Sequence, residues 1–67
     1  MDPNANLQEQ RKLAARLLEL PADELGNYTP AEQSEAYFAG LRLAELVEAL
    51  DQWITKGGFL PDGWQRR

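Results

Sequence analysis

The chain of 67 residues has no cysteine and no histidine, and Ser34 is its single serine. Without cysteine it forms no disulfide, and without either residue it lacks the usual ligands of transition metals. The same absences leave no nucleophile with a neighbouring base. Carboxylate pairs at helical spacing do occur, such as Glu45 with Glu48, and are interpreted as a solvated face. We therefore predict no enzymatic activity, no cofactor and no metal site.

The sequence also lacks a hydrophobic run of about 18 residues that could span a bilayer. Its segment Met1–Asn6 has neither the basic nor the apolar region of a signal peptide. We expect a cytoplasmic protein without a membrane partner. The formal net charge of -4 argues against general affinity for nucleic acid, because binding phosphates requires clustered lysine and arginine.

Two amphipathic segments are present, and the first predicts a helix over about residues 7–20. Asn6 has the side chain of an N-cap, with Glu9 three positions later able to complete a capping box. Pro21 lacks the amide that would continue the helix, which predicts its end at Leu20. Residues 1–5 are predicted to be a flexible N-terminus.

The second segment predicts a long helix over about residues 30–56. Thr29, Pro30 and Glu32 form a capping box with proline at the first helical position, and Gly57 favours a helix end. Gly40 lies beside the main apolar stripe and is interpreted as a site of close helix packing. The stripe consists of Ala36, Ala39, Leu43, Leu46, Val47, Leu50, Trp53 and Ile54.

The connector over residues 21–28 has the composition of a single helical turn with a left-handed exit at Gly26 or Asn27. The tail over residues 57–67 is predicted to be non-helical, with a turn at 61–63. Its bulky apolar side chains are expected to fold back over the open end of the core. These side chains are Phe59, Leu60 and Trp64.

Together these segments predict one all-α domain over residues 1–67, a helical hairpin in which the shorter helix covers about half of the longer one. Leu18 should then lie near Ala36 and Ala39. An apolar surface on the outer side of the long helix is left uncovered, and this predicts a homodimer. The alternative is a monomer in which the connector and the tail wrap the long helix.

The sequence therefore predicts a module that binds another protein, and itself, without catalysis. Acids crowd the chain between Asp23 and Asp51, so a DNA mimic that inhibits a nucleic-acid-binding protein is an alternative. A DNA-binding helix-turn-helix regulator is another, with the cations of the first helix and Arg66 and Arg67 on phosphate. The predicted interface consists of Tyr37, Phe38, Leu41, Glu45, Glu48, Trp53 and Trp64.

The last third of the chain contains the run from Leu43 to Trp53 followed by Gly57-Gly58-Phe59-Leu60-Pro61 and Trp64. In this spacing it resembles small uncharacterised helical proteins of actinobacteria and their phages. The resemblance brings no activity with it. It implies an accessory protein of a phage or bacterium that binds a host or phage protein.

Overall fold

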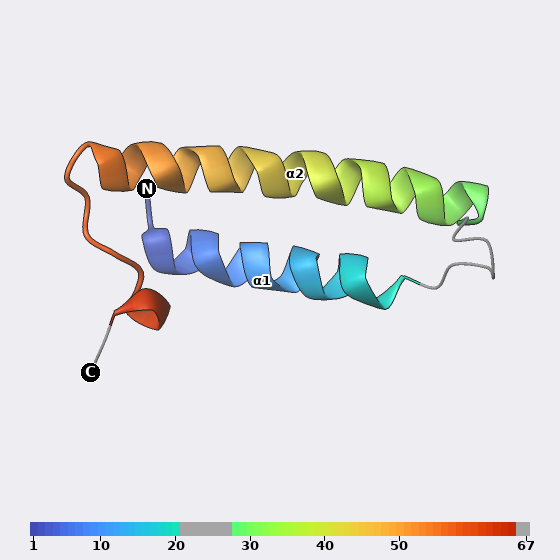
Figure 1. Cartoon of the computed structure of the whole chain (residues 1–67), viewed down its shortest axis with the longest axis horizontal. Coiled ribbons are helices and arrows are strands. Elements are labelled where there is room, and N and C mark those ends of the chain that lie inside the picture. The colour runs from blue at the N-terminus through green and yellow to red at the C-terminus, as the bar shows by residue number, and fades with distance from the viewer. Residues whose placement is uncertain (21–27, 66–67) are drawn as a thin grey trace.

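The computed structural model describes residues 1–20 and 28–65 and consists of two antiparallel helices and a short tail (Figure 1). Helix α1 spans Pro3–Glu19, helix α2 spans Pro30–Thr55, and a single 3-10 turn, η1, spans Asp62–Trp64. The molecule is elongated, with extents of 44 × 24 × 16 Å. The predicted all-α helical hairpin is confirmed. The turn predicted in the connector falls on residues 21–27, outside the described residues.

Helix α1 begins four residues earlier than predicted. The Asp2 carboxylate accepts hydrogen bonds from the backbone amides of Asn4 (2.9 Å) and Ala5 (3.2 Å), and Pro3 occupies the first helical position. Pro3 is also fully buried. The predicted N-cap at Asn6 and the predicted flexible segment over residues 1–5 are therefore wrong, because Asp2 and Pro3 already provide a helix start.

Helix α2 has the predicted boundaries. The Thr29 hydroxyl accepts from the Glu32 amide at 3.2 Å, and the Glu32 carboxylate accepts from the Thr29 amide at 2.9 Å, which completes the capping box. At the other end Gly57 has a φ of 95°, and the Gly58 amide donates to the Trp53 carbonyl at 2.8 Å. This is a Schellman motif, which ends the helix.

The core is small and lies between the two helices. Among the described residues, the buried hydrophobic side chains of this core are Leu7 from α1, Leu20 directly after it, and Leu46 and Leu50 from α2. Leu50 is the most completely enclosed of them, with 2% of its surface exposed. Burial of four leucines is a modest source of stability for a chain of this length.

Leu18 is 87% exposed, so its predicted packing near Ala36 and Ala39 is wrong. The reason lies in the tail. Leu18 follows Leu7 by eleven positions, about three full turns, so both side chains lie on the same side of α1. The tail covers the first part of that side, since a Cβ placed on Gly63 would be 3.2 Å from Leu7 Cδ2 and 3.0 Å from the Arg11 guanidinium, and it leaves Leu18 exposed.

The tail folds back against the start of α1, as predicted, and η1 lies beside that end of the helix in Figure 1. Pro61 is fully buried, and the Asp62 amide donates to Asn4 Oδ1 at 2.7 Å. The Trp64 amide donates to the Pro61 carbonyl at 2.9 Å, so the turn begins one residue later than predicted, and its 3-10 geometry over Asp62–Trp64 corrects the prediction of a non-helical tail. Phe59 and Leu60 stay 60% and 41% exposed, so proline rather than these side chains fills the contact.

Gly40 does not mark close packing within the chain. A Cβ placed on it would have no side-chain or distant backbone atom within 4 Å. The close-packing interpretation of this glycine is therefore wrong for a single subunit, and α2 continues through it without a break.

Candidate interaction surface

The outer face of α2 carries a group of exposed apolar side chains, which we call the outer patch: Tyr37, Phe38 and Leu41. Their exposed fractions are 63%, 67% and 47%. Leu41 precedes the buried Leu50 by nine positions, about two and a half turns, so the two side chains lie on opposite sides of α2 and Leu41 points away from α1. The rings of Tyr37 and Phe38 meet edge to face with centroids 5.4 Å apart. The structure thus gathers three of the predicted interface residues on one open face.

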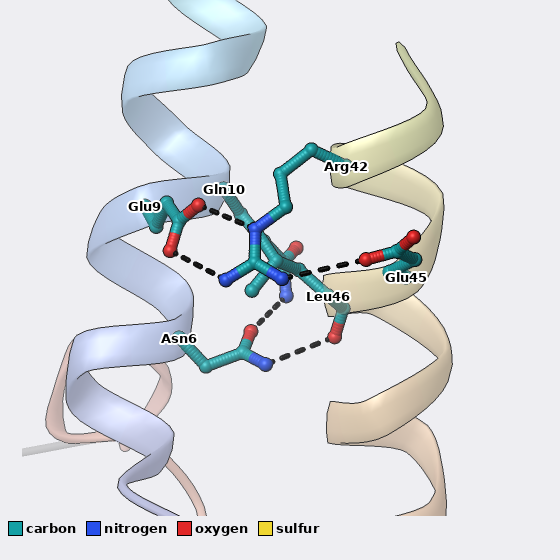
Figure 2. A network of polar contacts seen from close by, with 6 residues as sticks. All are labelled: Asn6, Glu9, Gln10, Arg42, Glu45 and Leu46. Carbon is teal, nitrogen blue, oxygen red and sulfur yellow. Dashed lines mark hydrogen bonds and ion pairs between the residues drawn. The ribbon is translucent and has the colours of Figure 1, made fainter. Parts of the chain in front are cut away.

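Two bidentate ion pairs join the helices and determine which face of α2 turns outward. Arg42 donates to both carboxylate oxygens of Glu9, at 2.7 and 3.1 Å (Figure 2). Arg16 does the same to Glu35, at 2.5 and 3.1 Å, so this α1 cation lies against an acid of α2. All four side chains are 40–51% exposed, so each pair contributes orientation more than stability.

A buried amide adds a third link between the helices. Asn6 is 7% exposed and donates from Nδ2 to the Leu46 carbonyl at 3.0 Å, while Gln10 Nε2 donates to Asn6 Oδ1 at 2.6 Å (Figure 2). Both polar ends of the Asn6 side chain are therefore satisfied. A slip of α1 along α2 would break this bond and both ion pairs, so the three links define one register.

The arginines shift the pKa values of their acid partners. The hydrogen bonds from the Arg42 guanidinium lower the pKa of Glu9, and those from Arg16 lower the pKa of Glu35. A folded-state pKa below the unfolded value means that the carboxylate stabilises the fold at pH values above its unfolded pKa. This stability is lost as the pH falls through the folded-state pKa.

We therefore expect the urea concentration at the unfolding midpoint to be lower at pH 3 than at pH 6. This decrease should be smaller in the double variant Glu9→Gln, Glu35→Gln. Circular dichroism at 222 nm measures the midpoint at both pH values. The control variant Glu19→Gln, Asp51→Asn removes the same charge from exposed positions outside the outer face of α2 and should keep the wild-type drop. An equal drop in both double variants would contradict the role given to Glu9 and Glu35.

The two predicted acids lie beside the outer patch toward the C-terminal end of α2. Glu45 is 71% exposed and accepts from Arg42 at 3.4 Å, and Glu48 accepts from Gln52 Nε2 at 3.3 Å. Both side chains are therefore on the surface, where they could form the polar rim of an interface.

The two predicted tryptophans are not part of the outer patch. Trp53 follows Leu41 by twelve positions, about 18 Å along the helix. It is half-buried against the tail, with its indole N–H donating to the Phe59 carbonyl at 3.0 Å and its ring edge to face with that of Phe59. Trp64 is 45% exposed and lines a groove with Leu50 and Ile54. Sequence reasoning could not separate these roles, because they depend on where the tail runs.

Three exposed or buried features were missed by sequence reasoning: the buried Asn6, the exposed Leu18, and Val47 at 50% exposure. Extending the first helix to Pro3 would have placed Asn6 on its core face. Leu18 and Val47 carried no such signal, because both belong to apolar stripes that are wider than the core.

In the part of the chain that the structure describes, no helix is long and apolar enough to cross a membrane, and no group of three or more acidic side chains is placed to hold a metal ion. Comparisons with protein families, with curated proteins and with solved structures find no match to the chain. The function is therefore argued from the exposed surface.

Proposed function

We propose that this protein is a non-enzymatic interaction module that binds protein, including a second copy of itself, through the outer patch. The observation that carries the proposal is the exposure of Tyr37, Phe38 and Leu41 on the face of α2 opposite the core. Exposed apolar groups gathered in this way are typical of protein interfaces. Tyrosine and phenylalanine at the centre with acids at the rim is the usual composition of such a surface.

The size of the core supports self-association. A domain of fewer than about 70 to 80 residues is usually reinforced by disulfides, by a metal or by oligomerisation. This chain has no cysteine and no histidine, which leaves oligomerisation. Covering the outer patch would add apolar burial to a fold that encloses few leucines in a single subunit.

Within this proposal, the resemblance of the last third of the chain suggests an accessory role in a phage or bacterium, in the cytoplasm, with a host or phage protein as a further partner. The tail and the C-terminal part of α2, where the resemblance lies, are separate from the outer patch.

The nucleic-acid alternatives have less support. Glu9, Glu35 and Glu45 lie against Arg42 or Arg16, which reduces the negative potential that a DNA mimic would offer. The helices run side by side (Figure 1), whereas a helix-turn-helix crosses at about 90–120°. The terminal residues Arg66 and Arg67, which that alternative invoked, lie outside the described residues.

Sedimentation equilibrium tests the proposal. The wild-type chain should show a species of twice its 7.6 kDa mass at micromolar concentration, and the double variant Tyr37→Ala, Leu41→Ala should shift the dissociation constant upward at least tenfold. Its helical circular dichroism should persist. The control Leu18→Ala removes an exposed leucine from α1 and should leave the association unchanged. A wild-type mass of 7.6 kDa throughout would overturn self-association.

A further inference from the structure

We infer that the second copy binds the outer patch in antiparallel orientation, with a twofold axis near Leu41. This inference rests on the proposed self-association and adds the orientation and the register of the partner. It follows from the uneven distribution of charge along the outer face of α2.

The outer face is apolar toward the N-terminal half of α2 and acidic toward the C-terminal half. Tyr37, Phe38 and Leu41 occupy the first part, and Glu45 and Glu48 follow, all of them exposed. Two copies in parallel would place each acid against its own counterpart, and such like-charge contacts disfavour the complex. Antiparallel copies place the acids of one subunit along the apolar and hydroxyl-bearing half of the other.

A twofold axis at Leu41 gives a register with matching partners. Leu41 meets Leu41 of the second copy, Glu45 lies across from Tyr37, and Glu48 lies across from Ser34. A tyrosine or serine hydroxyl donates a hydrogen bond to a carboxylate, so both acids meet a donor.

The shape of the face permits a close approach. Ala44 follows Leu41 by three positions and so lies on the same face, where its small exposed side chain leaves room for a second helix. Helices with small residues at the contact pack with axes about 8–10 Å apart. The two copies would then form a layer of four helices, with α2 and its symmetry mate at the centre.

Spin-label distances test the orientation directly, because the chain has no cysteine and each engineered thiol carries one label. Ser34→Cys and Glu48→Cys are matched variants at exposed positions seven residues before and after Leu41. In the antiparallel dimer each label lies about 21 Å along the axis from its mate, at 1.5 Å per residue over about 14 residues. Combined with a spacing of about 8–10 Å between the two helix axes, this offset gives about 23 Å between the labelled backbones in both variants.

Mixing the two labelled variants should add a short distance of about 8–10 Å, because Ser34 of one copy faces Glu48 of the other. Short distances within each single variant would show a parallel pair and overturn this inference while leaving self-association intact. Unequal long distances would place the axis away from Leu41 and overturn the register. A mass of 7.6 kDa in sedimentation, without a dipolar signal in either variant, would instead overturn the proposed self-association itself.

Discussion

Replacing Asn6 with aspartate is expected to unfold most of the protein at neutral pH. In the native chain the Asn6 amide donates to the Leu46 carbonyl from a position that is 7% exposed. An ionised carboxylate has no proton to donate, so it would face this carbonyl oxygen as a buried, unpaired charge. Such a change costs about 3–5 kcal/mol, comparable to the total stability of a domain of this size. Circular dichroism at 222 nm during urea titration measures the loss.

The pH dependence of the Asn6→Asp variant gives a second readout. Burial favours the neutral carboxyl and so raises its pKa in the folded state. Below pH 4 the carboxyl is neutral, so the free energy of unfolding of the variant should lie closer to that of the wild type. The difference between the two proteins should grow as the pH rises through the raised pKa. The control Gln8→Glu makes the same amide-to-carboxylate change at an exposed position of α1 and should stay near wild-type stability at pH 7. Equal effects of the two variants would show that charge on α1, rather than burial, is responsible.

Truncating Leu50 to alanine is expected to have an effect of similar size by a different mechanism. Leu50 is 2% exposed and lies among the few leucines that form the core, so its removal leaves a cavity near the C-terminal end of α2. Losses of about 2–5 kcal/mol accompany such substitutions. We expect the variant to show reduced helical signal at 25 °C and a broad, low urea midpoint.

The control for Leu50→Ala is Leu18→Ala, the same chemical change at a side chain that is 87% exposed. Surface substitutions of this kind stay within about 0.5 kcal/mol of the wild type. If the two variants lost equal stability, the side chain of Leu18 would have to be buried in solution, and the position of the tail relative to α1 would be wrong.

The boundaries of α2 could be predicted from the sequence because both of its ends are specified locally. Thr29 and Glu32 complete their hydrogen bonds within four residues, and Gly57 supplies the positive φ of the helix end. Signals of this kind require no knowledge of the rest of the fold. The outer patch was predictable for a related reason, since Leu41 and Leu50 lie on opposite sides of any helix.

The start of α1 was mispredicted because two N-cap signals compete in the first six residues. Asn6 with Glu9 fits a capping box, but Asp2 with Pro3 fits a helix start equally well. The structure resolves the competition by tertiary contacts, since Pro3 is buried and Asn6 reaches Leu46 on the other helix. A bond between residues 40 positions apart is invisible to local patterns. The exposure of Leu18 likewise depends on the path of the tail.

The contact between Trp53 and the tail gives the molecule a built-in optical probe. The indole is held by the Phe59 carbonyl and ring, and a methyl group on Gly58 would lie only 2.4 Å from two of its ring atoms. In a Trp64→Phe variant, which leaves Trp53 as the single tryptophan, emission from this indole therefore reports whether residues 58–65 are packed against α2. Release of the tail, followed by tryptophan emission, and unfolding of the two helices, followed by circular dichroism at 222 nm, could thus be measured in one sample.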